Sequence, residues 1–238
     1  MAVVVGKSWP PPLRGLLHYK EGLYMSRWVI AGMVLLVCLF PQEGRGAFSE
    51  KKLIDQLQET YRGTQSFQAD FVQKTEVTLL EKTIEKRGTM LFAKPDQFVI
   101  HYKSSPERKY ISDGHSLWIY DVAEKEMQVI QDVRQALERE ALAFLGGLGE
   151  LLKTFRVPSV KGVDSSYEYV LIPRLSSSSM EKIILLVHQE TFWVEGITLY
   201  PKGGNVSHYQ LKNQKMNIKT SPDLFHPKTP PGVRLQIF

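Results

Sequence analysis

Between residues 66 and 130 several segments alternate along the chain with the period of two that is typical of β-strands. In the first of these segments Phe67, Ala69 and Phe71 face one way, and Gln68, Asp70 and Gln73 face the other. Pro95 interrupts the pattern, and Asp113-Gly114 is a two-residue hairpin signal. The sequence therefore predicts strands at residues 66–77, 83–93, 98–102, 109–111, 117–120 and 126–130.

Two of these segments are apolar on both faces. Leu117–Tyr120 has apolar side chains at every position, and Met90–Ala93 is nearly the same. A strand needs only one apolar face to reach a core, so a second apolar face must also be covered. We expect either other parts of the protein or an apolar ligand to cover it.

Helical periodicity appears twice. Ser49 is a natural N-cap, and the apolar residues after it recur at helical spacing up to Gly63. Between residues 132 and 155 apolar residues again recur every three or four positions, but Gly146-Gly147 and Gly149 interrupt them. This pattern predicts two short helices with a flexible joint.

Four more strands are expected at residues 167–172, 182–188, 193–200 and 206–216, before a tail of short extended pieces. The prediction is an α+β fold with nine or ten antiparallel strands in one large sheet, an N-terminal helix and a helical insertion.

The N-terminal region resembles a secretory signal. An apolar run of thirteen residues, 28–40, follows Arg27 and precedes small residues. It is short for a membrane span, although an uncleaved anchor remains the alternative. We expect residues 25–47 to be a signal peptide that is cleaved after Gly46 or after Ala47.

The 24 residues before Met25 exceed what a signal peptide needs ahead of its charged region, so we expect translation to start naturally at Met25. Residues 1–24 would then be an upstream extension outside the natural protein. Residues 48–238 form the expected mature protein, and their number suits a single domain.

Removing the leader changes the charge of the protein. Residues 1–47 hold five of the 30 Lys and Arg residues and two of the 25 Asp and Glu residues, so the remainder has a formal charge of +2. This near-neutral balance does not indicate nucleic-acid binding. The single cysteine, Cys38, lies in the leader, so the mature chain would have no disulfide and no thiolate chemistry.

The sequence contains little catalytic or metal-binding chemistry. The six histidines are scattered singly, and none pairs with another at metal-ligand spacing. No nucleophile-elbow, P-loop or dinucleotide-binding motif is present. We expect no enzymatic activity, no metal and no cofactor.

The order of these segments resembles the periplasmic outer-membrane lipoprotein carrier family, LolA. The resemblance covers about residues 49–233. It rests on the first helix and on four segments: Ser66–Lys74, Gly88–Phe98 with Lys94-Pro95, Ser112–Tyr120 with Asp113-Gly114, and Pro230–Val233. It implies an incomplete antiparallel β-barrel, or half-barrel, with helices forming a lid over a hydrophobic cavity that takes lipoprotein acyl chains.

The resemblance also implies site residues. The lipid-binding cavity would be lined by Phe71, Leu91, Phe98, Ile100, Tyr102, Trp118 and Tyr120. The lid would contain Leu137, Phe144, Leu145, Gly146, Gly147, Leu148 and Leu152.

The family has an arginine before the proline of the Gly88–Phe98 segment, where it tethers the lid by hydrogen bonds. This chain has Lys94 at that position. Lysine keeps the charge but lacks the planar fork of a guanidinium. Lys94 is therefore either a weaker lid tether or a solvated residue at the end of a strand.

By resemblance, the protein is a monomeric periplasmic chaperone of a Gram-negative bacterium. It would take lipoproteins from an inner-membrane lipoprotein-releasing ABC transporter complex and deliver them to an outer-membrane acceptor. Two alternatives remain open. One is an outer-membrane-anchored acceptor of the same fold, lipidated at Cys38. The other is a lipid-binding module that senses envelope stress.

Overall fold

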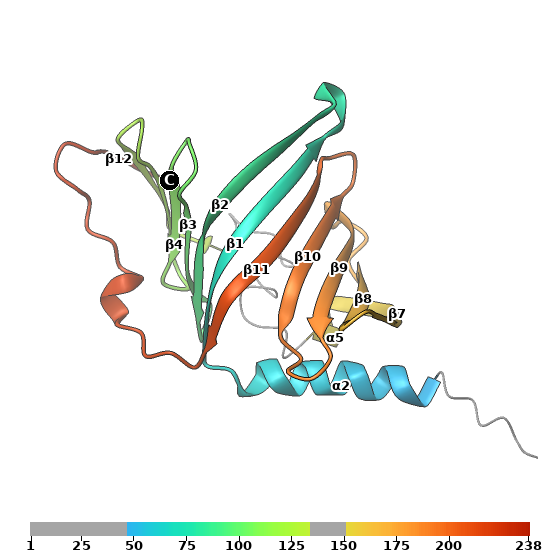
Figure 1. The fold of residues 1–238 in the computed structure, drawn as a ribbon. Coiled ribbons are helices and arrows are strands. Elements are labelled where there is room, and N and C mark those ends of the chain that lie inside the picture. Colours follow the sequence, from blue (N-terminus) through green and yellow to red (C-terminus); the bar gives the residue numbers. More distant parts are fainter. Residues whose placement is uncertain (1–46, 134–150) are drawn as a thin grey trace, which may run out of the picture. The chain divides into compact units, whose positions relative to one another are not determined.

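A single curled sheet forms most of the structure (Figure 1). A computed structural model describes residues 47–133 and 151–238 of the 238-residue chain. The described residues include twelve strands, in the spatial order β12-β6-β5-β4-β3-β2-β1-β11-β10-β9-β8-β7. Neighbouring strands are antiparallel except β12 and β6, which are parallel. β12 and β7 stand at the two edges of this order, so the sheet stays open.

The strands β1 to β6 confirm the expected series of strands and turns after the first helix. The long hairpin of β1 and β2 turns through a short 3-10 helix, η2. The bounds are β1 Ser66–Val77, η2 Thr78–Leu80, β2 Lys82–Ala93, β3 Gln97–Tyr102, β4 Arg108–Ser112, β5 Leu117–Asp121 and β6 Glu126–Ile130.

The second group of strands returns to pair with β1. Its last long strand, β11, lies beside β1, and the others follow outward from it. The bounds are β7 Phe155–Val163, β8 Ser166–Pro173, β9 Met180–His188, β10 Val194–Pro201, β11 Val206–Met216, the 3-10 helix η4 Pro222–Leu224 and β12 Arg234–Ile237.

Two helices accompany the sheet: α2, Ala47–Gly63, and the short α5, Leu151–Thr154. α2 presents Leu57 and Tyr61 to the sheet, and both are buried against Tyr169, Leu185 and their neighbours. The phenol of Tyr169 donates a hydrogen bond to the carbonyl of Leu53, at 2.9 Å. Burial and hydrogen bonds together fix the helix across one end of the strands, as Figure 1 shows.

Four details differ from the sequence prediction. The first helix begins at Ala47, two residues before Ser49. Phe155, expected in a helix, opens the strand β7, and a final strand, β12, pairs with β6. The connection between β4 and β5 has four residues instead of two, because the Asp113 carboxylate accepts hydrogen bonds from the backbone of His115 and Ser116. The expected α+β fold with an incomplete antiparallel barrel is confirmed.

The C-terminal segment between β11 and β12 crosses the outside of β4, β5 and β6 (Figure 1). Phe225 in this segment is buried, and the His226 ring meets the Trp118 ring edge-on at 6.3 Å. The Thr229 hydroxyl lies 4.0 Å from the sulfur of Met127. The outer face of these three strands is therefore covered by the chain itself.

Candidate ligand-binding face

Strand register assigns every sheet side chain to one of two faces. Residues directly opposite each other in antiparallel strands share a face, and successive residues alternate. We call the face of Phe67, Ala69 and Phe71, against which α2 packs, the inner face. The opposite side is the outer face.

Four of the seven residues predicted to line the cavity lie on the inner face. Phe71 belongs to it by definition, and the pairs Phe92 with Phe98, Met90 with Ile100, and Gly88 with Tyr102 extend it onto β3. Phe71 and Phe98 are buried, whereas Ile100 and Tyr102 are partly exposed. Their contact with a lipid stays a prediction.

The other three, Leu91, Trp118 and Tyr120, lie on the outer face. Leu91 is one position from the inner-face residues Met90 and Phe92, and Trp118 and Tyr120 flank Ile119 in the same way. The strand register thus separates them from the other four. Trp118 instead contacts the C-terminal segment through His226. The expectation that all seven residues share one surface is corrected accordingly.

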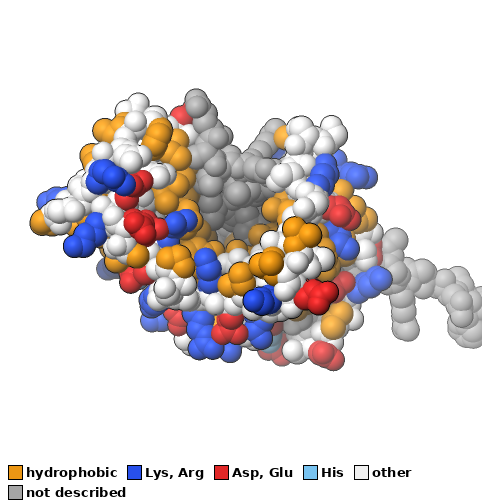
Figure 2. All heavy atoms as spheres, turned by 90° about the horizontal axis from the view of Figure 1, so that it is seen from above, with side chains coloured by type: hydrophobic (Ala, Val, Ile, Leu, Met, Phe, Trp, Pro, Cys, Tyr) orange, Lys and Arg blue, Asp and Glu red, His pale blue; other side chains and the backbone are white. Residues whose placement is uncertain are grey.

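On β2–β6 the inner face carries an apolar surface that is only partly buried. Its centre is the buried cluster of Phe98, Leu117 and Val133. Five partly buried side chains pack around this centre: Phe92, Ile100, Tyr110, Ile119 and Ile130. Figure 2, seen from above, shows two walls of described residues standing apart, with hydrophobic side chains gathered along the inner side of the left wall. Partly exposed apolar side chains in such numbers are typical of a ligand-binding surface.

Aromatic rings join this surface to the core under α2. The Phe71 and Tyr102 rings meet edge-on at 5.0 Å, above Gly88 of the strand between them. A Cβ atom at Gly88 would lie 2.6 Å from the Phe71 ring and 2.1 Å from the His101 carbonyl oxygen, so only glycine fits there. Tyr102 also hydrogen bonds to Tyr209, and burial raises the pKa of both phenols. Both rings therefore stay neutral in the physiological range.

Lys94 ties the end of β2 to the end of α2. Its ammonium donates to the carbonyl oxygens of Tyr61, at 3.0 Å, and Arg62, at 2.8 Å. These carbonyls belong to the last turn of the helix, where backbone acceptors lack partners within the helix and a positive charge is favourable. Lysine thus makes a two-point contact without a guanidinium. Its role as a lid tether stays a prediction.

Of the predicted lid residues the structure describes only Leu152. It lies in α5 and is 38% exposed, and its backbone N–H donates to the Gln58 side chain of α2 at 3.3 Å. The other six predicted lid residues lie outside the described residues: Leu137, Phe144, Leu145, Gly146, Gly147 and Leu148.

Sequence reasoning missed several polar residues of the inner face, among them Gln73, Arg108 and Tyr209. Gln73 follows Phe71 by two residues within β1, so alternation places it on the inner face and the expectation that it faces the other way is wrong. Arg108 of β4 reaches the inner face through its pairing with Tyr102 of β3. Arg108 donates from Nη2 to Asp121 at 2.6 Å and also hydrogen bonds to Tyr110. The Arg108 guanidinium holds the pKa of the Asp121 carboxyl below its usual value.

A search of residues 47–133 and 151–238 finds no group of three or more His, Cys, Asp or Glu side chains that could hold a metal ion. Within the same ranges, no helix has the length and apolar character needed to cross a membrane.

The sequence matches the family described as "Outer membrane lipoprotein carrier protein LolA" over residues 62–228. An outer-membrane lipoprotein carrier protein of Shewanella oneidensis is 30% identical over 161 residues, which cover 67% of this chain and 74% of that protein. A protein of the same name from Legionella pneumophila (strain Corby) is 27% identical over 200 residues, covering 84% and 95%. The chain belongs to the LolA family.

Among solved structures, an uncharacterized conserved protein of Thermus thermophilus superposes with a TM-score of 0.51 at 9% identity, covering 80% of this chain and 99% of that one. This similarity supports the fold alone.

Proposed function

We propose that this protein is a non-enzymatic periplasmic chaperone that binds the acyl chains of lipoproteins and carries them from the inner to the outer membrane. The observation that supports this most directly is the partly exposed apolar inner face of β2–β6. Relatives named lipoprotein carrier proteins, which align with most of the chain, support lipoproteins as the class of cargo. The donor would be an inner-membrane lipoprotein-releasing ABC transporter complex, and an outer-membrane acceptor would receive the cargo.

The partial burial of this face suits a carrier. Covering an acyl chain gains roughly 0.8 kcal/mol for each buried methylene, so cover of a few methylenes already holds a chain. A carrier must also release its cargo, which favours a surface that stays partly open over a sealed core.

A charge placed on the inner face tests the proposal. In Ile100→Glu the new carboxylate stands on the inner face, and in the matched control Val99→Glu it stands on the outer face of the same strand. We expect a synthetic diacylated lipopeptide to bind the wild type and Val99→Glu but not Ile100→Glu, because burying a charge against acyl chains is costly. Thermal melting confirms that both variants are folded.

Transfer is measured separately. The wild type should accelerate movement of the lipopeptide from donor vesicles to acceptor vesicles, and Ile100→Glu should not. A wild-type protein that binds no lipopeptide, or equal binding by both variants, contradicts the proposal. Mass spectrometry of the mature N-terminus distinguishes the carrier from an acceptor lipidated at Cys38, and co-purification of a regulatory partner would identify the sensor.

A further inference from the structure

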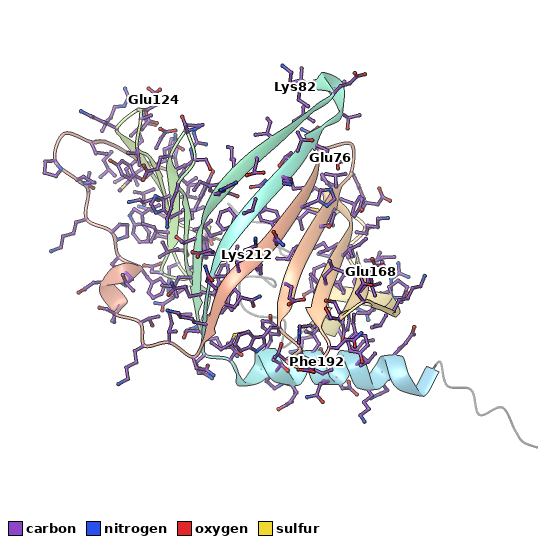
Figure 3. The ribbon with its side chains drawn as sticks, in the orientation of Figure 1. Glu76, Lys82, Glu124, Glu168, Phe192 and Lys212 are labelled. Carbon is purple, nitrogen blue, oxygen red and sulfur yellow. The ribbon has the colours of Figure 1, made fainter. Side chains whose placement is uncertain are left out.

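The inner face of β2–β6 changes from apolar to polar along the strands. At the end near α2 its cross-strand row contains Phe98, Leu117 and Ile130. Two rows further, the same strands carry Tyr102 and the pair Arg108 and Asp121. Figure 3 labels Glu124, in the turn after β5, at this polar end, and Phe192 at the opposite end beside α2. A ligand on this face therefore meets apolar side chains at one end and polar side chains at the other.

Buried polar atoms without a partner are present on this same face. Among the described residues three buried side-chain atoms have no hydrogen-bond partner: Gln73 Oε1, Arg108 Nε and Gln214 Oε1. Gln73 and Arg108 belong to the inner face by register, and Gln214 precedes by two residues Met216, which pairs with Phe67. Leaving such an atom unpaired destabilises a fold, so each calls for an explanation. A ligand that brings the missing partners would provide one.

The two groups near the polar end have complementary chemistry. Nη2 of Arg108 is occupied by Asp121, which leaves the Nε–H as a donor for an oxygen acceptor. The Gln73 amide nitrogen donates to Thr75 at 3.0 Å, which leaves the Gln73 oxygen as an acceptor for an N–H group. Tyr102 of β3 lies on the same face between them, and Tyr209 lies opposite Gln73 on β11. The site thus offers one donor and one acceptor above an apolar floor.

We propose that Arg108 and Gln73 form a polar subsite for the headgroup of a diacylglyceryl cysteine. Arg108 Nε donates to an ester carbonyl of the glyceryl unit, and Gln73 Oε1 accepts from an amide N–H of the acylated cysteine. The acyl chains then run along the inner face toward Phe98 and Leu117. This inference rests on the proposed function, and it adds the orientation of the cargo.

The test for Arg108 compares two probes. One is a synthetic peptide with an S-(dipalmitoylglyceryl) cysteine, and the other is its dihexadecyl ether analogue, which has chains of the same length but no ester carbonyl. We expect the wild type to bind the ester probe about tenfold more tightly, as a charge-assisted hydrogen bond would give. Arg108→Met should remove this preference, because methionine has no donor. Lys109→Met, which removes a charge from the outer face of the same strand, should keep it.

Loss of Arg108 also leaves Asp121 without its partner, so the pair variant Arg108→Met/Asp121→Asn is measured beside it. It should show the same loss of preference with a native melting curve. A preference that survives in both variants contradicts the inference. If the wild type binds both probes with equal affinity, the inference is also contradicted, but the proposed function remains intact. A wild type that binds neither probe contradicts the proposed function.

The test for Gln73 separates lipoproteins from phospholipids, since both contain diacylglycerol esters. Dipalmitoyl phosphatidylglycerol has no amide N–H, so Gln73→Met should leave its binding unchanged. The same variant should bind the lipopeptide about fivefold more weakly, because one hydrogen bond is lost. An unchanged affinity for the lipopeptide, or an equal loss for both ligands, contradicts the role of Gln73.

Discussion

In one half of the sheet, formed by β1 and β7–β11, helix α2 packs across one end of the inner face and completes a buried core. In the other half, β2–β6, most described inner side chains are only partly buried. Under the helix, Tyr169, Leu171, Leu185 and Val187 are fully buried. On β2–β6 most of the apolar inner-face residues are only partly buried. The same alternation of side chains therefore produces a permanent core in the helix-covered half and an accessible surface in the β2–β6 half.

Buried polar groups that pack against α2 are paired, whereas others on the inner face are not. In the helix-covered half Tyr61 accepts a hydrogen bond from the Val194 backbone N–H at 3.0 Å, and burial raises the pKa of its phenol to about 12. Tyr169 is likewise paired with the helix backbone. In the β2–β6 half Arg108 keeps a buried donor without a partner. Unpaired buried atoms therefore occur in both halves, Gln73 Oε1 on β1 and Gln214 Oε1 on β11 as well as Arg108 Nε on β4, whereas the tyrosines that pack against α2 are paired.

The largest expected effect comes from Ile183→Ala in the helix-covered half. Ile183 is 3% exposed and packs in the main core. Removing its side chain should lower the free energy of unfolding by about 3 kcal/mol, through lost burial and the cavity left behind. Denaturant titration measures this loss, while lipopeptide affinity of the folded fraction should stay unchanged. If the lipopeptide affinity fell in proportion to the free energy of unfolding, the two halves would not have separate roles.

Lys94→Met tests the link between the sheet and α2. The variant loses two hydrogen bonds from a charged donor to helix carbonyls and should lower the free energy of unfolding by about 1–2 kcal/mol. Lys94→Arg should keep most of the wild-type free energy of unfolding. Lys82→Met, at an exposed position in the β1–β2 hairpin, should leave it almost unchanged. Equal melting temperatures for Lys94→Met and Lys82→Met would show that the contact adds no stability.

Ile119→Ala is the counterpart of Ile183→Ala in the β2–β6 half. Because Ile119 is already partly exposed, its removal should lower the free energy of unfolding by only about 1 kcal/mol. Binding of a hydrophobic dye and of the lipopeptide should weaken instead. Trp118→Ala, on the outer face of the same strand, should leave both affinities unchanged while loosening the C-terminal segment. If the affinity for the dye fell in Trp118→Ala but not in Ile119→Ala, the outer face of β5 would be the ligand-binding face.

Local sequence signals were enough to place most strands between residues 66 and 130: β1 alternates along the chain, and Leu117–Tyr120 of β5 is an apolar run that follows turn residues. β12 has no such signal, since its four residues pair in parallel with β6 more than a hundred residues earlier. β7 was missed because the helical spacing before it extends to Phe155, and Pro158 interrupts its own pattern. Strand positions are local properties, whereas these pairings depend on distant residues.

The candidate site was predictable only in part. Phe98, Ile100 and Tyr102 alternate within one strand, so they were placed together. Trp118 belongs to the predicted cavity lining through the family resemblance, but the face that it occupies depends on the register of β5 with β4, and that register follows from the four-residue turn around Asp113. Arg108 and Gln73 are ordinary polar residues in the sequence. Gln73 reaches the apolar face by alternation within β1, whereas only the pairing of β4 with β3 brings Arg108 onto it.

The smallest expected effect is a pH dependence in the β2–β6 half. The Arg108 guanidinium lowers the pKa of Asp121 from its ordinary value of 3.8, so the folded state favours the charged carboxylate. The stabilisation is fully present above that ordinary value and is lost as the pH falls through the lower folded pKa. The difference in unfolding free energy between the wild type and Asp121→Asn should therefore stay constant down to about pH 4 and then shrink. Since the Arg108 side chain is 42% exposed, solvent screening keeps this difference small. A difference that persists to low pH, or that already shrinks near neutral pH, would show that the pair does not act as a charged pair on this face.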